Sequence, residues 1–370
     1  MSILITGSEG FLSKNFFFYL REKSNDQIFL FNKQKSLKTL EKYILKSKYI
    51  FHFAGENKPK NKNHFKKNNE NLTKYICKFI KSKNLECRLI FSSTVHIQKK
   101  SLYGQSKLNS EKIILKYLKN TKAKPIIFRL PNLYGKWAKP NYNSVFATFA
   151  NNIFKKKKNL IKNKNIINFL FIDDAVKQIY DNSLKIKIKT YPLIKYINKI
   201  SPPELDKVMR HMLTYRNYSS IKKININFLK KIYSTFLTYA SKKYFTYKLE
   251  SKKDIRGEFM EFLRLSKFGQ ISFFDINPGY TRGNHFHHLK TEKFFITRGK
   301  VKINFKNILT KKKFSFNLSY KDKKVIETIP GYAHSIENTG KEIAQGIVWA
   351  NEEFNINYPD TYGFKVNEKI

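Results

Sequence analysis

Thr94, Tyr103 and Lys107 form the first group of residues whose types and spacing suit chemistry. Tyr103 and Lys107 are four residues apart, so on a helix they share a face, and an ammonium beside a phenol lowers the pKa of the phenol from about 10. Several other tyrosines also have a lysine four residues later, so the pair alone selects nothing. Thr94 is the selecting feature, because it follows an apolar run and its hydroxyl can reach the same carbonyl oxygen. The group predicts acid/base work on a carbonyl.

His285, His287, Glu292 and His334 form a second group, and their types are those of metal ligands. Side chains repeat every two residues on a strand, so His285 and His287 point to the same side. With the carboxylate and the third histidine they make three nitrogen ligands and one oxygen ligand for a divalent metal. We expect zinc, while nickel, manganese and iron stay open. His288 points to the other face by the same alternation, and we exclude it as a ligand.

A glycine turn near the N-terminus forms the third group, with Gly7, Gly10 and Phe11 between an apolar run and a helical pattern. Glycine lets the backbone approach a pyrophosphate, and the N-terminus of the following helix supplies amide donors. The next apolar run ends at Phe31 and lacks the acidic residue that binds the ribose 2′-hydroxyl of NAD. Lys33 is placed to pair with a 2′-phosphate, so the sequence predicts NADPH, although Lys33 also fits an ordinary surface lysine.

The elements that must position these residues follow from the apolar runs. Five runs rich in Ile and Phe predict strands buried on both faces: 3–6, 27–31, 49–53, 88–93 and 125–130. Helical segments lie between them, for example 11–22, 68–83 and 104–121. This alternation predicts an α/β fold with a Rossmann-type, doubly wound parallel sheet.

The pattern changes after about residue 250. Short apolar runs at 270–276, 293–299 and 344–350 are separated by turn residues, which is typical of an antiparallel barrel or sandwich. We therefore expect two domains, an N-terminal one over residues 1–245 and an all-β one over residues 246–370.

Composition narrows the classes of partner. The chain has 370 residues and a formal net charge of +46, which first suggests nucleic acid. Lysine far outnumbers arginine and is spread along the chain, so we expect no nucleic-acid partner and only steering of anionic ligands. No apolar run is long enough to span a membrane, and the N-terminus enters a strand pattern directly, so we expect neither a membrane partner nor a signal peptide. Two cysteines fit a reducing cytoplasm.

Residues 1–185 resemble the extended short-chain dehydrogenase/reductase family. The matching segments are 6–10, 52–55, 129–135 and 173–174, together with Thr94, Tyr103 and Lys107. The resemblance implies that Thr94, Tyr103 and Lys107 form a reductive triad, that Ala54 and Gly55 line the cofactor beside Lys107, and that Asn132 contacts a nucleotide-sugar. Dehydratases of the family carry Asp-Glu after the threonine. Val95 and His96 stand here instead, so the residues for water elimination are missing.

The histidine group resembles the two cupin motifs, the second of which reads Gly331 through His334 to Asn338. The segment 254–262 resembles the entry strand of dTDP-sugar 3,5-epimerases, which are also cupins. This implies that a jelly-roll barrel handles a 4-ketosugar nucleotide, with a base removing the proton beside the ketone and an acid returning it on the opposite face. Glu258, His288 and Tyr280 stay open as candidates for the base.

The pairing of these two parts resembles the CapF-type bifunctional enzymes of capsular polysaccharide biosynthesis, with the segments 135–145, 282–288 and 360–362 as characteristic pieces. The resemblance implies that Asn132, Asn141, Tyr142 and Asn143 contact substrate and that the protein is a homodimer. It also implies epimerisation at carbon 3 of UDP-2-acetamido-2,6-dideoxy-L-arabino-4-hexulose and NADPH-dependent reduction at carbon 4. Two alternatives stay open, a single-activity reductase whose cupin serves dimerisation and a basic nucleic-acid-binding module.

Overall fold

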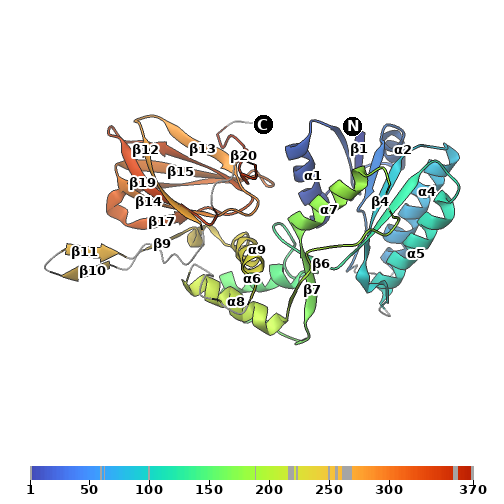
Figure 1. Ribbon diagram of the computed structural model, residues 1–370, viewed down its shortest axis with the longest axis horizontal. Helices are drawn as coiled ribbons and strands as arrows, with labels where there is room; N and C mark the ends of the chain where they lie inside the picture. The colour runs from blue at the N-terminus through green and yellow to red at the C-terminus, as the bar shows by residue number, and fades with distance from the viewer. Residues whose placement is uncertain are drawn as a thin grey trace. The chain divides into compact units, whose positions relative to one another are not determined.

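The computed structural model describes residues 2–58, 61, 63–98, 101–187, 189–215, 221, 224–248, 251–254, 257–260, 269–352 and 357–367. Their contacts divide the chain into two units (Figure 1). The first comprises Met1–Val145 and Asn163–Pro202, and the second comprises Phe146–Lys162 and Pro203–Ile370. Each unit is described by itself below.

The first unit is built on a parallel sheet of five strands in the order β2-β1-β3-β4-β5. Its strands are β1 (Ser2–Thr6), β2 (Gln27–Phe31), β3 (Tyr49–His52), β4 (Arg88–Thr94) and β5 (Lys124–Leu130). The strand order reverses between β1 and β3, and ligands of doubly wound sheets bind outside the carboxyl ends of the strands at such a point. The predicted doubly wound parallel sheet is confirmed.

Helices cover both faces of this sheet, as Figure 1 shows for α1 and α7 on one side and α4 and α5 on the other. The helices are α1 (Phe11–Lys23), α2 (Leu37–Leu45), α3 (Asn63–Phe65), the π-helix η1 (Lys66–Asn71), α4 (Leu72–Ser82), the 3-10 turn η2 (Val95–Gln98), α5 (Leu102–Leu118) and α7 (Ile172–Leu184). One core joins α2, α4 and α5 to the sheet, with Leu4, Leu40, Ile80 and Ile114 all fully buried. Burial on both faces explains why the strands are continuously apolar.

A small second sheet extends the first unit beyond β5. It has the order β6-β7-β8, with β6 (Asn132–Tyr134), β7 (Ile167–Phe171) and β8 (Asn198–Ile200). The β6 and β7 strands run parallel, with Asn132 paired with Phe169. Asn132 begins β6 two residues after β5 ends at Leu130, so this polar residue lies close to the end of β5. This placement brings the 130–144 segment to the carboxyl end of the main sheet.

The second unit holds two five-stranded antiparallel sheets, in the orders β12-β19-β14-β17-β9 and β16-β15-β18-β13-β20. The strands are β9 (Thr246–Lys248), β12 (Gln270–Ile276), β13 (Thr281–Phe286), β14 (Glu292–Arg298), β15 (Lys300–Asn307), β16 (Lys313–Ser319), β17 (Lys324–Glu327), β18 (Tyr332–Asn338), β19 (Ala344–Ala350) and β20 (Tyr362–Gly363), and the 3-10 turn η4 (Tyr320–Asp322) follows β16. A separate hairpin pairs β10 (Ser251–Asp254) with β11 (Gly257–Met260). The predicted antiparallel, cupin-like β architecture is confirmed.

Three helices belong to the second unit although they precede the strands, namely α6 (Val145–Phe154), α8 (Pro202–Tyr215) and α9 (Ile226–Leu237), and the 3-10 turn η3 (Lys242–Tyr244) follows them. Phe154 of α6 stacks on Phe236 of α9 with ring centroids 4.4 Å apart. The Tyr233 hydroxyl of α9 donates to Glu327 of β17 at 2.6 Å. Helix α9 is therefore joined to α6 by an apolar contact and to β17 by a polar one.

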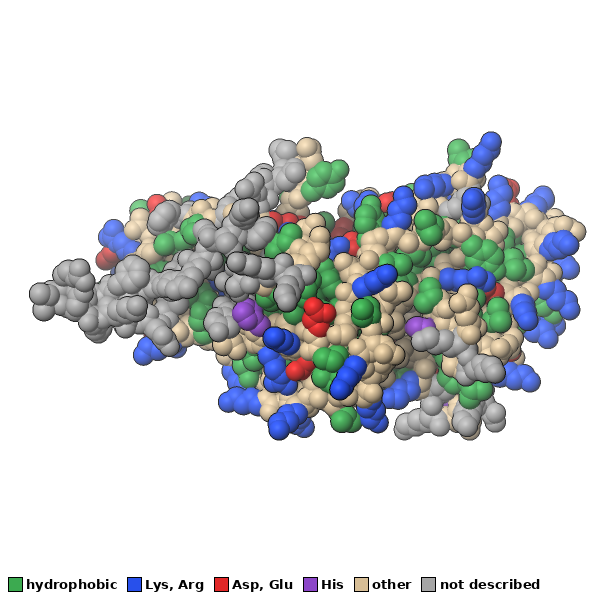
Figure 2. All heavy atoms as spheres, turned by 60° about the horizontal axis from the view of Figure 1, so that its bottom comes forward, with side chains coloured by type: hydrophobic (Ala, Val, Ile, Leu, Met, Phe, Trp, Pro, Cys, Tyr) green, Lys and Arg blue, Asp and Glu red, His purple; other side chains and the backbone are tan. Residues whose placement is uncertain are grey.

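Lysine and arginine side chains are spread over the face that Figure 2 shows, without a single dominant patch. No helix among the described residues is long and apolar enough to cross a membrane.

Candidate active site and candidate metal centre

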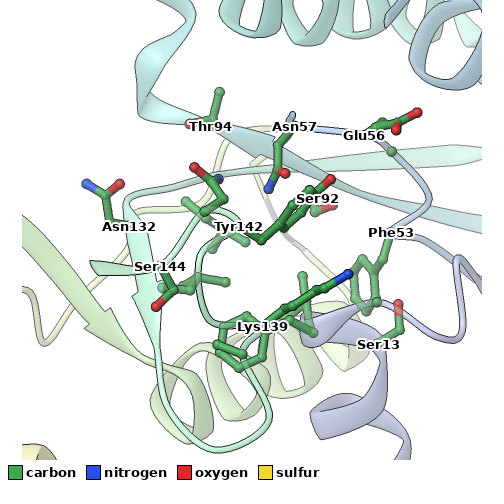
Figure 3. A pocket seen from close by; sticks show the side chains of 18 of the residues that line it. Ser13, Phe53, Glu56, Asn57, Ser92, Thr94, Asn132, Lys139, Tyr142 and Ser144 are labelled. Carbon is green, nitrogen blue, oxygen red and sulfur yellow. The ribbon is translucent and has the colours of Figure 1, made fainter. Parts of the chain in front are cut away.

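A cavity of about 650 Å³ opens in the first unit, where the N-terminus of α1 meets the carboxyl ends of β4 and β5 (Figure 3). The α1 helix contributes Gly10 and Phe11 to the lining, β4 contributes Thr94, and α5 contributes Tyr103 and Lys107. The loop after β6 closes the opposite wall. The cavity therefore brings together residues that lie far apart in the sequence, at the place where doubly wound sheets bind ligands.

Only part of the glycine turn lines this cavity: Gly10 and Phe11 do, whereas Gly7 and Ala54 lie outside the lining. Gly7 has φ +67°, and a Cβ at this position would lie 2.6 Å from the Cα of Ala54, so only glycine fits. Gly10 donates its amide to the oxygen of Gly7 at 2.8 Å and precedes α1, whose first turn has no side-chain cap. Uncapped amides at a helix N-terminus that lines a cavity are suited to hold a pyrophosphate.

Lys33 lies outside the lining of the cavity. It follows β2 and is exposed to solvent. Its neighbour Asn32 donates to the Glu9 carboxylate at 2.9 Å, so the end of β2 is tied to the glycine turn.

Lys107 is the most constrained member of the predicted triad. It is 4 % exposed, and its ammonium donates to the main-chain oxygen of Ser92 at 2.8 Å and lies 4.6 Å from the ring centroid of Phe91. A Cβ at Gly55 would lie 3.0 Å from the Lys107 Nζ, so glycine there leaves room for the ammonium. Burial lowers the pKa of Lys107 to about 8, although Glu111 opposes the change.

Tyr103 differs from the expectation drawn from the sequence. Burial, with a smaller contribution from Tyr142, raises the pKa of Tyr103 to about 12, whereas we expected Lys107 to lower it. The expectation was wrong because burial disfavours the charged phenolate, and Lys107 is not among the groups that shift the pKa of Tyr103. Thr94 ends β4 and lines the same cavity, and its hydroxyl accepts a hydrogen bond from the His96 amide at 3.2 Å.

A buried chain of hydrogen bonds supports the cavity from behind, and the sequence did not reveal it. His52 bonds Thr6 through Nδ1 at 2.8 Å and Thr73 through Nε2 at 2.9 Å. Burial, with a smaller effect of Lys107, lowers the pKa of His52 to about 3, so the imidazole is neutral. Asn69 accepts from the Glu56 amide at 2.7 Å and donates to the Ser106 hydroxyl at 2.9 Å. These contacts hold the segment after β3 against α5.

The predicted substrate contacts divide into two groups. Asn132, Tyr142 and Asn143 line the cavity, whereas Asn141 lies outside the lining and has φ +58°. Among the described residues, the lining also includes some that we did not single out: Glu56, Asn57, His96, Trp137, Lys139 and Ser144. Figure 3 shows Lys139 extending across the cavity toward Phe53. Most of these residues lie in the segments 52–55 and 135–145 or next to them, so the resemblance had marked the right regions of the chain.

The four predicted metal ligands meet in the second unit. The candidate ligand atoms of His285, His287, Glu292 and His334 all lie within 4.8 Å of one another. His285 on β13 is directly opposite His334 on β18, whereas Glu292 begins β14 in the other sheet. The Glu292 Oε2 lies 3.4 Å from the Nε2 of His287 and 3.2 Å from the Nε2 of His334. The cluster therefore takes ligands from both sheets.

The protonation of the cluster suits metal binding. Burial, assisted by the other two histidines, lowers the pKa of His285 to about 4. Burial disfavours the charged form of Glu292, but hydrogen bonds and the charges of His287 and His334 hold the pKa of Glu292 well below its usual range. The Nε2 atoms of both histidines and the Glu292 Oε2 are buried without a hydrogen-bond partner. Burial also lowers the pKa of His334, whereas Glu292 and Asp360 raise the pKa of His287 against the effect of its burial. Three imidazoles and one carboxylate are a ligand set for zinc or a similar ion, so these residues fit a divalent metal.

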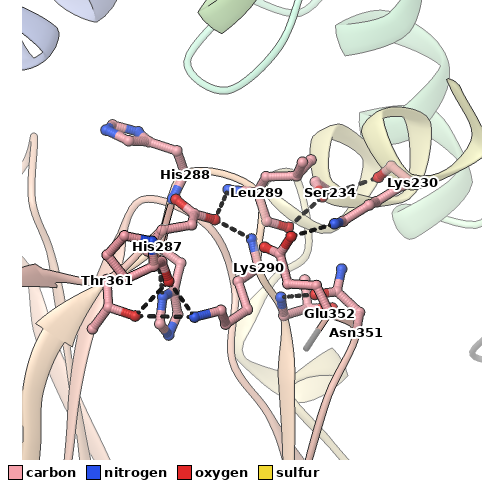
Figure 4. Close-up of polar contacts among 12 residues, drawn as sticks. Lys230, Ser234, His287, His288, Leu289, Lys290, Asn351, Glu352 and Thr361 are labelled. Atoms are coloured by element: carbon pink, nitrogen blue, oxygen red, sulfur yellow. Dashed lines mark hydrogen bonds and ion pairs between the residues drawn. The ribbon is translucent and has the colours of Figure 1, made fainter. Parts of the chain in front are cut away.

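The candidate bases for epimerisation lie in different surroundings. The His288 ring lies 5.0 Å from the Tyr362 ring, and Figure 4 shows it directed away from His287. Tyr280 is 68 % exposed. The side chain of Glu258 lies outside what the structure describes, as do the other side chains of the segment 254–262.

Two protein-family models match different parts of the chain. Residues 3–180 match the NAD dependent epimerase/dehydratase family, and residues 252–362 match the polysaccharide biosynthesis C-terminal domain. A Pseudomonas aeruginosa protein named UDP-2-acetamido-2,6-beta-L-arabino-hexul-4-ose reductase is 33% identical over 372 residues, which cover 100% of both chains.

Solved structures give the same result. The capsular polysaccharide assembling protein CapF from Staphylococcus aureus is 32% identical, with 99% of this chain and 100% of that chain covered and a TM-score of 0.63. A UDP-glucuronic acid 4-epimerase from Bacillus cereus in complex with NAD is 18% identical with a TM-score of 0.52 and covers 57% of this chain and 82% of its own, so it shares the fold alone. The chain therefore belongs to the CapF-type family of polysaccharide biosynthesis proteins, in which an epimerase/dehydratase segment precedes a C-terminal polysaccharide biosynthesis domain.

Proposed function

We propose that this chain is a bifunctional UDP-sugar enzyme of capsule or O-antigen synthesis. The cupin part epimerises carbon 3 of UDP-2-acetamido-2,6-dideoxy-L-arabino-4-hexulose. The reductase part then reduces carbon 4 with NADPH, which gives UDP-2-acetamido-2,6-dideoxy-L-talose in the UDP-N-acetyl-L-fucosamine pathway. The observation that carries the proposal is the single cavity that Thr94, Tyr103 and Lys107 share with the uncapped N-terminus of α1. The name of the Pseudomonas aeruginosa relative supports the same substrate.

Tyr103 is the proton donor for the reduction. With its pKa raised to about 12 by burial, the phenol keeps its proton at neutral pH and can give it to the carbonyl oxygen of the substrate. Thr94 places a hydroxyl on the same oxygen, and Lys107 supplies a positive charge that it loses as the pH rises through its pKa of about 8. The bound dinucleotide supplies the hydride.

NADPH is the cofactor that the end of β2 favours. No acidic residue stands at Phe31, Asn32 or Lys33 to bind a ribose 2′-hydroxyl, and the exposed Lys33 is free to meet a 2′-phosphate. The epimerase/dehydratase match supports a nicotinamide cofactor in general. Gly7, Gly10 and Phe11 would hold its pyrophosphate.

The second unit supplies the epimerisation. His285, His287, Glu292 and His334 would hold zinc, which supplies Lewis-acid stabilisation of negative charge on oxygen. The carbon-3 proton is acidic because it lies beside the ketone, so one base and one acid on opposite faces suffice. Glu258, His288 and Tyr280 are the candidates for the base.

We assign residues 1–245 to the reductase and residues 246–370 to the cupin by sequence, and we propose a homodimer by family resemblance. Cys77 and Cys87 are buried free thiols, which supports a reducing cytoplasmic compartment. The alternative is a single-activity nucleotide-sugar reductase whose cupin serves only dimerisation.

A comparison of wild type with Tyr103→Phe tests both halves. The variant should lose NADPH oxidation by at least about a hundredfold, the usual scale for loss of a general acid. In deuterium oxide without NADPH, it should still incorporate deuterium at carbon 3 of the 4-hexulose as fast as wild type. Unchanged NADPH oxidation in the variant contradicts the triad, and reduction by wild type without deuterium at carbon 3 favours the single-activity alternative.

A further inference from the structure

The segment between His287 and Glu292 connects two of the four candidate ligands. Its residues 288–291 belong to no helix or strand, so no ladder of main-chain hydrogen bonds sets their conformation. The separation of the two ligand side chains therefore depends on whatever accepts the amides of this segment. Figure 4 shows side chains from distant parts of the chain gathered around it.

A single carboxylate accepts three of these amides. The Asp360 Oδ1 accepts from the His288 amide at 2.9 Å, and its Oδ2 accepts from the amides of Leu289 at 2.9 Å and Lys290 at 2.6 Å. Hydrogen bonds to an ionised acceptor are among the stronger ones in proteins.

Side chains also accept the next two amides. Thr291 donates to the Asn351 Oδ1 at 3.0 Å, and Glu292 donates to the Thr328 hydroxyl at 2.9 Å. Five consecutive amides, from residue 288 to residue 292, are thus accepted by side chains, and Asp360 takes the three that follow His287.

The main chain of Asp360 fixes the histidine itself. The His287 Nδ1 lies 2.5 Å from the Asp360 carbonyl oxygen, which can only accept, so the ring proton is on Nδ1. The Nε2 is then the atom that faces Glu292, at 3.4 Å from its Oε2. A hydrogen bond of this kind selects the tautomer and the orientation of a ligand histidine.

Asp360 is itself held rigidly. It has φ +40°, a conformation that Asp tolerates better than most residues. The Lys290 ammonium donates to the Pro359 oxygen at 2.5 Å and to the Thr361 hydroxyl at 3.0 Å. Two residues later, β20 pairs with β13, with Tyr362 opposite Phe286 and Gly363 opposite His285.

We propose that Asp360 is a positioning residue of the metal centre, which sets both the ring orientation of His287 and the conformation of the segment that leads to Glu292. This inference rests on the metal assignment of the proposed function. It gives the segment just before β20 a role in metal affinity, although the two parts of the chain are about 70 residues apart in sequence.

The test is the zinc affinity of Asp360→Asn, measured in the full-length protein by competition with a chromophoric chelator. Asparagine keeps the side-chain volume and accepts positive φ, but it replaces one of the two accepting oxygens by an NH₂ group, which cannot accept from the segment's N–H groups, and it removes the negative charge. We expect zinc affinity to fall about 10- to 100-fold, the usual effect of removing an outer partner of a ligand. Asp322→Asn is the matched control, because the exposed Asp322 also accepts a main-chain amide, from Ser319, within the turn η4.

Two results would overturn the inference. An Asp360→Asn affinity within twofold of wild type, with the Asp322→Asn value also unchanged, would show that the carboxylate does not position the ligands. A measurement on the unaltered, zinc-loaded protein covers the case in which the variant does not fold. Long-range ¹H–¹⁵N spectra should show His287 with its proton on Nδ1, and a proton on Nε2 contradicts the proposed role. Failure of wild type to bind zinc at all would instead refute the metal assignment of the proposed function.

Discussion

The ammonium of Lys107 donates to the main-chain oxygen of Ser92 at 2.8 Å, which ties the middle of α5 to the end of β4. Thr94 lies two residues beyond Ser92 on the same strand, so this one contact fixes the spacing between the helix that carries Tyr103 and the strand that carries Thr94. The ammonium is also desolvated, and burial lowers the pKa of Lys107 to about 8.

The first prediction is an alkaline limb in the pH profile. Above pH 8, Lys107 loses its charge, so kcat/KM for NADPH-dependent reduction should fall with an apparent pKa near 8. Tyr103 titrates too high, at about 12, to account for such a limb. In Lys107→Arg the limb should disappear, because arginine stays charged, whereas Lys107→Met should be weakly active at every pH. An unchanged limb in Lys107→Arg would assign the titration to another group.

The second prediction concerns cofactor choice. Lys33→Glu should raise the KM for NADPH at least about tenfold, because a carboxylate at the end of β2 repels a 2′-phosphate and favours a free ribose hydroxyl. The KM for NADH should stay the same or fall. Lys38→Glu, an equally exposed change of charge on α2, is the control for general electrostatics. If the two substitutions raised the KM for NADPH equally, Lys33 would not be a specific contact of the cofactor.

The third prediction concerns the metal. His334→Ala removes a buried ligand that faces the Glu292 carboxylate at 3.2 Å, so the purified protein should lose its zinc and its deuterium exchange at carbon 3. His288→Ala should keep the metal, because the structure places His288 outside the ligand cluster. Elemental analysis and proton NMR measure the two effects. Full zinc content in His334→Ala would contradict the ligand set.

The fourth prediction concerns a buried ion pair between β14 and β17. The Lys293 ammonium lies 2.5 Å from the Glu327 Oε1, both side chains are 1% exposed, and Tyr233 donates to the same oxygen. Lys293→Met should lower the free energy of unfolding by about 3–5 kcal/mol, because it leaves a buried carboxylate without its counter-ion.

The matched control for that prediction is Arg298→Met, which breaks the exposed pair of Arg298 and Glu342 in the same unit. Its cost should stay below about 1 kcal/mol. Urea unfolding measures both variants. If both variants lost the same free energy of unfolding, burial of the Lys293–Glu327 pair would not increase the effect of removing its cation.

The sequence was most informative where local pattern controls structure. The apolar runs of β1, β3 and β4 are largely buried, so the positions of these strands could be predicted from continuous apolar sequence alone. The edge strand β2 is only partly buried, yet its run at 27–31 was also apolar enough to be predicted. The spacing of His285, His287 and Glu292 belongs to a single stretch, and the structure brings them together with His334.

Long-range contacts could not be predicted in this way. Asp360 meets the 288–290 amides across about 70 residues, and α9 packs with strands that follow it, because tertiary packing decides both. The predicted direction of the Tyr103 pKa shift was wrong for the same reason. The spacing of Tyr103 and Lys107 in the sequence does not reveal how deeply Tyr103 is buried. Lys139 and His96 reach the cavity from segments that the resemblance marked or bordered, yet only the folded chain shows which side chains line it.

The most direct measurement is the structure of the product. Wild-type protein is incubated in deuterium oxide with UDP-2-acetamido-2,6-dideoxy-L-arabino-4-hexulose and NADPH, and the product is identified by NMR. The account predicts one NADPH oxidised for each molecule of UDP-2-acetamido-2,6-dideoxy-L-talose, with deuterium at carbon 3. Unchanged NADPH and recovery of the 4-hexulose would contradict it, as would a reduced sugar that keeps the original configuration and the proton at carbon 3.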